Sequence, residues 1–298
     1  MTVEHEFGSN LDVSLGYIGN VGRHLNGGFN VNSAVPGPGP LDPRRPLFNQ
    51  FGITQGIFDK CDCTSSNYNS LQVRAQERLG TNYTLLASFT YSKTMDFGEF
   101  GTPTDQYNAR LDYGPASFDR EFVFTLAHTV YLPFGRGRRY LASASRMVDA
   151  VLGGWQFNGI TTVYGGLPFS PTLSNNASLN SDMSLRPNQI GDPLKGISQN
   201  RDLWFNPAAY AVPAPFLFGT AANNSIRGPN LFTADWSLSK EFAITERFRL
   251  QFRWEVFNAF NRTNLALPVN AVDAGNAGQI TDIAVPMRNM QLGLRLGW

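Results

Sequence analysis

Three histidines are the side chains of this sequence best suited to acid–base or metal chemistry, and they are widely separated as His5, His24 and His128. His5 and Glu6 begin the zinc-protease pattern H-E-x-x-H, but Ser9 stands where the second histidine is needed. The chain also contains no G-x-S-x-G nucleophile elbow and no G-x-x-x-x-G-K-[ST] phosphate loop. We therefore predict no catalytic residue, no metal site and no cofactor, and we expect that the protein is not an enzyme.

The two cysteines, Cys61 and Cys63, form the sequence C-D-C among turn-forming residues. A single intervening residue leaves little room for an unstrained disulfide. Two ligands without further partners also make a poor zinc site. We expect a chemically idle pair, with a strained bridge or an adventitious metal as the alternatives.

Basic residues do not dominate the chain, which has 24 Lys and Arg, 23 Asp and Glu, and a net charge of +1. A nucleic-acid binder usually has a basic imbalance, so we expect no nucleic-acid partner. The run "GRGRR" over residues 135–139 is the one basic cluster. We interpret it as a solvated turn, with nucleic acid or lipid headgroups as the alternatives.

Alternation of apolar and polar residues is the main structural signal. It is clearest over residues 71–79, 83–91 and 248–256, where apolar side chains occupy every second position, with Glu77 as the exception. In a membrane barrel the apolar set faces lipid and the polar set faces the lumen, whereas a soluble sandwich buries the apolar set. The predicted lumen-facing charges are Arg74, Arg78, Arg249, Arg253, Glu255 and Arg295. We expect them to pair with carboxylates such as Glu241 or to hold a plug, with guidance of an anionic solute as the alternative.

Composition supports an all-β fold, with 13% aromatic residues, 29 Gly and 18 Pro. No run of 18 apolar residues occurs, and the mean hydropathy of -0.22 is compatible with barrel strands because these alternate. Further strands are predicted over residues 11–18, 121–132, 155–164 and 289–298, with a weak one over 3–7. The best helical candidate is 140–152, inside a connection.

Connection lengths alternate between long and short in this arrangement. The long set is predicted at residues 19–69, 93–120, 165–230 and 258–288, and the short set at 8–10, 80–81, 134–154 and 243–247. Outer-membrane barrels have short periplasmic turns and long extracellular loops. We therefore expect one rim of turns and one rim of exposed, polar loops such as 34–46 and 172–193.

The last strand carries an apolar face that ends the chain on an aromatic residue. Its apolar members are Met290, Leu292, Leu294, Leu296 and Trp298. Such a terminal strand is similar to the signal by which outer-membrane barrels are recognised for assembly. We therefore expect the barrel-assembly machinery and outer-membrane lipid as partners.

Six segments, in order, resemble the C-terminal barrel of TonB-dependent receptors of the Oar-like type. They are "NYNSLQVRAQERLGTNYTLLASFTYSKTMD" from Asn67, "SFDREFVFTLAHTVYLPFGRGRRY" from Ser117, "GGWQFNGITTVYGGLPFSP" from Gly153, "WFNPAAYAVP" from Trp204, "SIRGPNLFTADWSLSKEFAITERFRLQFRWEVFNAFNRTN" from Ser225 and "MQLGLRLGW" from Met290. The resemblance covers most of the chain. It implies an outer-membrane receptor that binds and takes up a bulky nutrient, with energy coupled through the TonB system.

In that family a plug domain fills a 22-stranded barrel. We expect this chain to be a partial antiparallel transmembrane β-barrel of about eight or nine strands, without plug, TonB box or signal peptide. The substrate is left open. The alternatives are a complete eight-stranded outer-membrane barrel with a structural or adhesive role, and a secreted β-sandwich adhesin or binding module.

Overall fold

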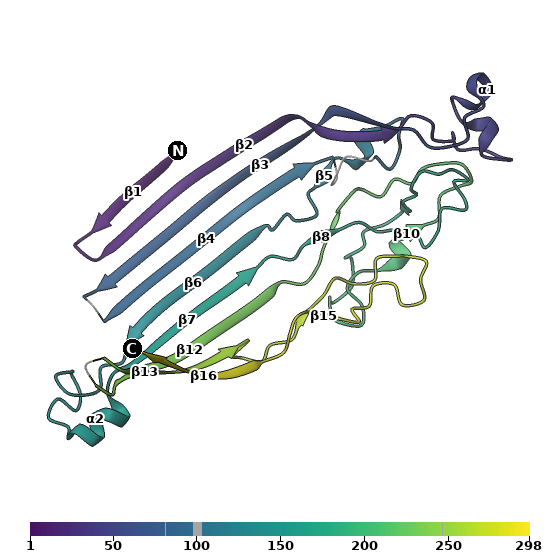
Figure 1. The fold of residues 1–298 in the computed structure, drawn as a ribbon. Helices are drawn as coiled ribbons and strands as arrows, with labels where there is room; N and C mark the ends of the chain where they lie inside the picture. Colours follow the sequence, from purple (N-terminus) through teal and green to yellow (C-terminus); the bar gives the residue numbers. More distant parts are fainter. Residues whose placement is uncertain (81, 98–102, 246) are drawn as a thin grey trace.

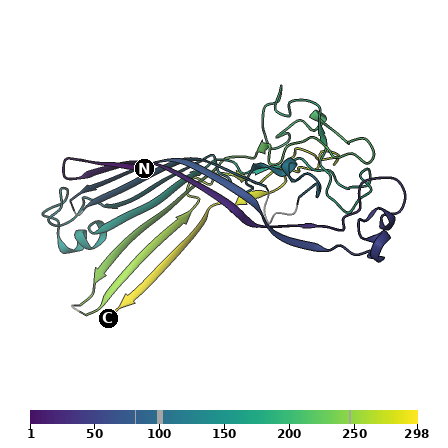
Figure 2. The ribbon, with the colours of Figure 1, turned by 90° about the horizontal axis from the view of Figure 1, so that it is seen from above.

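The computed structural model describes residues 1–80, 82–97, 103–245 and 247–298, and one curved antiparallel sheet dominates it (Figures 1 and 2). Within the described residues, nine strands follow one another in the order β1-β2-β3-β4-β6-β7-β12-β13-β16, and β5 pairs with β4 beside this path. We call these nine strands the wall. Each wall strand pairs antiparallel with the next, so the sheet is an up-and-down meander.

The wall strands are β1 (Thr2–Phe7), β2 (Leu11–Asn30), β3 (Phe58–Leu79), β4 (Tyr83–Asp96), β6 (Phe122–Tyr131), β7 (Trp155–Tyr164), β12 (Leu231–Ala243), β13 (Arg249–Phe257) and β16 (Asn289–Gly297). The short strands are β5 (Gly114–Pro115), β8 (Pro168–Phe169), β9 (Asn188–Gln189), β10 (Tyr210–Ala211), β11 (Ile226–Arg227), β14 (Asn264–Leu265) and β15 (Ile283–Val285). The helices are α1 (Phe48–Phe51) and α2 (Arg146–Leu152), and the 3-10 turns are η1 (Asp42–Arg44), η3 (Ala109–Asp112) and η4 (Pro207–Ala209).

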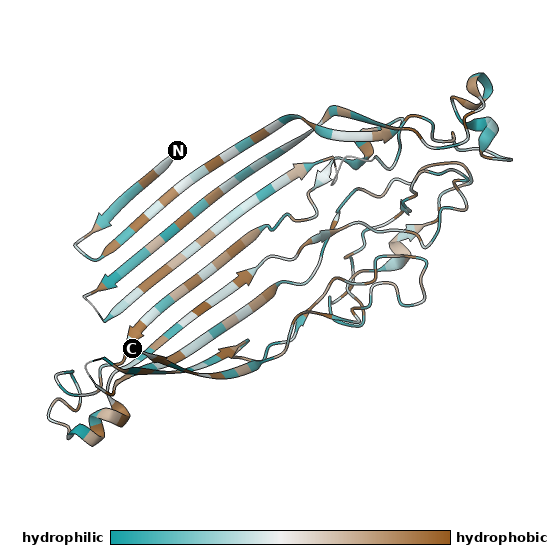
Figure 3. Cartoon of the chain, viewed as in Figure 1, coloured by the Kyte–Doolittle hydropathy of each residue, from teal (hydrophilic) through white to brown (hydrophobic). Residues whose placement is uncertain are grey.

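Cross-strand register places the apolar positions of all nine wall strands on one face. Residues opposite each other in an antiparallel pair share a face, so a single register decides the side of every side chain. Apolar residues meet in the pairs Leu71 with Tyr91, Phe89 with Phe124, Phe232 with Val163, Leu238 with Trp254, and Trp254 with Leu292. We call this side the apolar face and the other the polar face; the alternation shows as bands along the strands in Figure 3.

Nothing among the described residues packs as a second layer over most of the apolar face. Leu292 and Leu294 are each 72% exposed, and Leu15, Tyr17, Leu71 and Tyr91 are also exposed. A soluble sandwich would bury such residues against a second sheet. The sandwich alternative is therefore wrong, and the all-β barrel architecture predicted from alternation is confirmed.

Connections at the two ends of the wall differ in length as predicted, except that residues 132–154, at the end with the short turns, form a connection almost as long as residues 97–121 at the other end. At the end that we call the turn rim they span residues 8–10, 80–82, 132–154 and 244–248, and at the opposite loop rim they span 31–57, 97–121, 165–230 and 258–288. Figure 1 shows α2 at the turn rim and α1, β8, β10 and β15 at the loop rim. Of the predicted turns, Thr81 and Glu246 lie outside the described residues.

The first long connection is shorter than expected, because β2 continues past residue 18 to Asn30 and β3 begins at Phe58, well before residue 71. They have 20 and 22 residues, whereas about 9–11 suffice to cross a bilayer. Their ladder runs on past register shifts near Leu25 to the pair of Asn30 with Phe58. The Gly- and Asn-rich extension lacks alternation, so sequence periodicity gave no sign of it, although its backbone still pairs.

The long connections were predicted to be exposed loops, and this is wrong. We call the connections of the loop rim the cap. One cluster of buried side chains contains Phe169, Phe205, Tyr210, Ala221 and Ile226, and a second contains Leu179, Met183 and Leu185. These apolar residues are scattered among Ser, Asn and Pro, so no periodic pattern in the sequence predicts that they pack together.

Edge strands β1 and β16 are not paired with each other in the described residues. The sheet therefore stays open, and the weak strand predicted at residues 3–7 is present as β1. A complete barrel of eight strands is thus not formed. Because an open edge is not viable in lipid, the wall needs further strands to close.

Two smaller predictions are corrected. Cys61 and Cys63 are joined by a disulfide within β3, rather than forming an idle pair. The helix predicted over residues 140–152 begins only at Arg146, where the Ser145 hydroxyl accepts a hydrogen bond from the Val148 amide. No helix in the described part of the chain is long and apolar enough to span a membrane.

Candidate functional site

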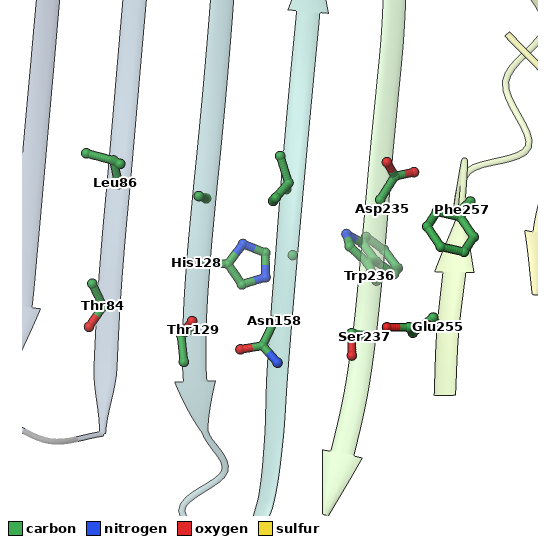
Figure 4. A pocket seen from close by; sticks show the side chains of 13 residues that line it. Thr84, Leu86, His128, Thr129, Asn158, Asp235, Trp236, Ser237, Glu255 and Phe257 are labelled. Atoms are coloured by element: carbon green, nitrogen blue, oxygen red, sulfur yellow. The ribbon is translucent and has the colours of Figure 1, made fainter. Parts of the chain in front are cut away.

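A hollow of the wall lies on its polar face, across strands β4 to β13 (Figure 4). Its volume is about 430 Å³. Polar side chains on this face are Thr84, Thr129, Asn158, Ser237 and Glu255. The hollow is a shallow, open surface whose lining combines polar and apolar groups, rather than an enclosed pocket.

Three apolar side chains, Leu86, Ile160 and Phe257, interrupt the polar face within this hollow. Ile160 is 54% exposed there. Each stands on the polar side of its strand, out of phase with the apolar set. We infer that the surface is suited to another protein segment or an amphipathic solute, since both offer apolar contact together with hydrogen bonds.

His128 of β6 and Trp236 of β12 meet at Gly159 of β7, on the apolar face of the wall. A Cβ on Gly159 would lie 2.4 Å from His128 Cε1 and 3.0 Å from Trp236 Cδ1. Glycine therefore makes room for the two rings. The His128 ring packs 5.1 Å from the Phe157 ring, in contact with aromatic neighbours rather than with a second acid–base group.

The predicted lumen-facing charges lie on the polar face, and several of them are brought together on the last strands. Arg249 Nη1 lies 3.0 Å from Glu241 Oε1, and Arg253 Nη1 lies 3.4 Å from Glu255 Oε1. Gln291 Nε2 donates to Glu255 Oε2. These residues form a charged ladder across β12, β13 and β16 that links neighbouring strands.

The remaining predicted charges lie apart from that ladder or at its margin. Arg74 donates to Gln76 Oε1 at 2.7 Å on the same strand, and Arg78 is exposed near the turn rim. Arg295 lies opposite Gln251 and lines a smaller hollow of about 210 Å³ with Arg253 and Glu255. Arg74 and Arg78 on β3 are thus separated from the β13 and β16 charges by intervening strands.

The terminal strand forms the apolar edge that the sequence indicates. Met290, Leu292, Leu294 and Leu296 stand opposite Val256, Trp254, Phe252 and Leu250 of β13. Trp298 is 88% exposed. The geometry places this edge where another strand can add, and its role in assembly stays a prediction.

Ion pairs hold the cap above the loop-rim end of the wall. Asp182 accepts hydrogen bonds from Arg45 Nη1 at 2.6 Å and from the Ala34 amide at 2.9 Å, which joins two long connections. The hydrogen bond that Arg45 donates to Asp182 raises the pKa of Arg45. Asp119 similarly binds Arg227 and joins the end of the second connection to β11.

A second buried pair lies deeper in the cap, where Arg186 Nη2 is 3.2 Å from Asp112 Oδ1. Burial lowers the pKa of Arg186, although the Asp112 charge opposes this. Asp112 also accepts hydrogen bonds from the Thr104 amide and hydroxyl, each at 2.6 Å. Pairing of these charges joins the second and third connections of the loop rim.

Sequence reasoning missed the hollow residues Leu86, Ile160 and Phe257 and the acidic partners Asp112, Asp119 and Asp182. The first three are visible as apolar residues that break the alternation of their strands. The aspartates carry no local signal, because their arginine partners lie 74, 108 and 137 residues away in the sequence.

The family described as outer membrane beta barrel domain matches residues 1–291 of the chain. The crystal structure of the outer membrane transporter YddB from Escherichia coli is similar, with a TM-score of 0.53 and 11% sequence identity. The match covers 99% of this chain and 31% of that one, so the chain spans about a third of the transporter's length. No curated protein matches.

Proposed function

The chain belongs to the outer membrane beta barrel domain family, and on this premise we propose that it forms part of the wall of an Oar-like, TonB-dependent receptor. Its location is the outer membrane, so lipid covers the apolar face and the polar face borders the lumen. The parent protein then binds a bulky nutrient at the cap and admits it through the lumen.

The observation that carries this proposal is the open nine-stranded wall with a folded cap at one rim only. An open edge requires further strands in the same barrel. Large barrels enclose a lumen that a plug can fill, whereas eight strands leave room only for side chains or one small ligand. The out-of-phase residues Leu86, Ile160 and Phe257 provide apolar contacts for a plug inside that lumen.

The charged ladder on β12, β13 and β16 supports the same role. Exposed ion pairs contribute little to stability, usually below about 1 kcal/mol. Their placement on the inner face instead provides alternating charges against which a plug can form hydrogen bonds. We expect no catalytic chemistry from this arrangement, and the substrate class is decided by the cap and the plug.

The test uses the full-length protein and the purified periplasmic domain of the TonB protein from the same envelope. We expect direct association of the two, and loss of growth on one nutrient of a panel of saccharides, peptides and metal chelates when the gene is deleted. A receptor that binds no TonB domain, and whose deletion strain grows normally on the entire panel, would contradict the proposal.

We also propose that the terminal strand is the segment that the barrel-assembly machinery recognises. Its apolar residues end on Trp298 at an open edge. Deletion of Trp298 from the full-length protein is expected to reduce surface exposure of an epitope placed in the cap. Unchanged exposure, relative to a Gly297→Ala control, would contradict this role.

A further inference from the structure

The connection between β6 and β7 is exceptional among those of the turn rim. It spans residues 132–154, whereas the other three described connections there have three to five residues. A tight turn is sufficient to join neighbouring antiparallel strands. The additional length therefore needs another explanation.

Helix α2 within this connection is attached to the apolar face of the wall. Lys240 Nζ donates to the carbonyl oxygens of Asp149 and Ala150 at 3.1 and 2.7 Å. Trp155 Nε1 donates to the Val151 carbonyl at 2.8 Å. Lys240 stands opposite Trp155 and Phe252 on the apolar face, and so its ammonium group caps the last turn of α2 from the lipid-facing side.

The same attachment leaves apolar side chains of α2 uncovered. Met147 and Val151, one helical turn apart, are 81% and 65% exposed. An apolar groove of about 380 Å³ is lined by Leu132, Phe134, Leu141 and Leu152 of the connection and by the wall residues Trp155 and Leu238. The groove is continuous with the lipid-facing surface, and its size and lining suit an acyl chain.

The same connection carries several positive charges. The connection contains four exposed arginines, Arg136, Arg138, Arg139 and Arg146, and one acidic residue, Asp149. Asp149 Oδ1 accepts a hydrogen bond from the Arg136 amide, and none of the four guanidinium groups forms an ion pair with a described carboxylate. Arg138 instead donates to Asn82 Oδ1 of the neighbouring turn.

We propose that residues 132–154 form a binding site for an anionic phospholipid of the periplasmic leaflet. One acyl chain lies in the groove between α2 and the wall, Met147 and Val151 enter the bilayer, and the arginines bind the phosphate. Short connections of outer-membrane barrels face the periplasm, which places these residues at the inner leaflet. An amphipathic helix with basic residues beside its apolar face lies in the plane of such an interface.

The main test compares lipid binding by charge-matched variants of the full-length protein. Detergent-purified protein is incubated with equimolar phosphatidylglycerol and phosphatidylcholine, and retained lipids are counted by native mass spectrometry. We expect about a tenfold preference for phosphatidylglycerol in the wild type, since each basic residue near an anionic surface contributes favourably. R136Q/R138Q/R139Q is expected to retain the two lipids almost equally.

The matched control R23Q/R110Q/R288Q removes three exposed arginines towards the loop rim and is expected to keep the preference. The charge-conserving R136K/R138K/R139K is also expected to keep most of it, which separates binding from misfolding. A preference that is equal in the wild type and R136Q/R138Q/R139Q, or lost equally in both Gln triples, would overturn the proposal.

A second variant tests the apolar contribution. M147Q/V151Q is expected to retain fewer molecules of both phospholipids at unchanged preference, whereas I190Q/L217Q in the cap is expected to behave as the wild type. Ile190 and Leu217 are also exposed, at 67% and 59%. Equal retention by the two pairs would show that α2 does not enter the bilayer. These measurements need neither TonB nor a nutrient, so they succeed or fail separately from the proposed uptake function.

Discussion

The wall and the cap of this protein bury their apolar residues in different surroundings. In the cap, Phe205 is fully buried in a protein core, whereas in the wall Leu292 and Leu294 remain 72% exposed to what must be lipid. Among the described buried apolar residues, only Ala234 and Val256 belong to the wall strands. The cap is therefore stabilised by packing of side chains, and the wall by backbone pairing and by the bilayer.

The largest effect that would sharpen this comparison is expected from Phe205→Ala. Phe205 packs against Phe169 and Tyr210 at ring-centroid distances of 5.8 and 6.2 Å. Its truncation leaves a cavity in a closely packed cluster and is expected to cost about 3–5 kcal/mol of cap stability. Limited proteolysis of the cap is the measurement, with Phe89→Ala on the lipid face as the control.

Phe89→Ala is expected to have a much smaller effect, because acyl chains can fill the space that the ring leaves. Protease resistance reports on the cap, and heat-modifiable migration reports on the wall. If Phe205→Ala and Phe89→Ala weaken both properties equally, the cap and the wall are not stabilised independently.

A charge deletion in the cap is expected to have an effect of similar size. Asp112→Ala leaves the buried Arg186 guanidinium without its carboxylate and is expected to destabilise the cap by roughly 3–5 kcal/mol. The double variant D112A/R186M removes both charges and is expected to recover part of the loss. Denaturation in guanidinium chloride, followed by proteolysis of the cap, measures the stability of both variants. A double variant that is less stable than D112A would contradict the ion-pair account.

The wall responds most to a charge on its apolar face. Leu292→Arg is expected to cost about 2–4 kcal/mol of insertion free energy if the residue lies near the bilayer midplane. Gln291→Arg, next along β16, points to the polar face and is expected to insert normally. The fraction of heat-modifiable protein in outer membranes reports the difference. Equal insertion of the two variants would show that the apolar and polar faces are assigned wrongly.

The smallest effect is expected for the exposed pair of Glu241 and Arg249. Glu241→Gln removes one charge of a pair whose groups are both largely exposed. Its loss is expected to change wall stability by less than about 1 kcal/mol. Thermal unfolding in detergent at low and high salt measures it. A larger loss would show that the ladder stabilises the wall directly.

Sequence predicted the wall far better than the cap. Alternation locates strand β7 to the residue and assigns Leu71, Phe89 and Trp254 to one face, because a period of two is a local property. The extension of β2 beyond Ile18 was missed, since Gly and Asn pair through the backbone without a side-chain pattern.

The cap and the candidate site depend on contacts between residues far apart in the chain. The pair of Asp182 with Arg45 joins two connections, and the cluster around Phe205 gathers residues spread from Phe169 to Ile226. The charges on β12, β13 and β16 were predictable as a face, and the pairing of Arg249 with Glu241 follows from one hairpin. The attachment of α2 by Lys240 could not be predicted, because a lysine among apolar positions does not indicate which group it binds.

The most direct test of the central claim measures which face of the wall meets lipid. Nitroxide labels are placed singly at Leu292, Gly293, Leu294 and Arg295 of the full-length protein in bilayers, with Cys61 and Cys63 replaced by Ser. We expect labels at 292 and 294 to be accessible to oxygen and shielded from a water-soluble nickel chelate, and labels at 293 and 295 to show the reverse. Equal accessibility at all four positions, or the opposite alternation, would contradict the account.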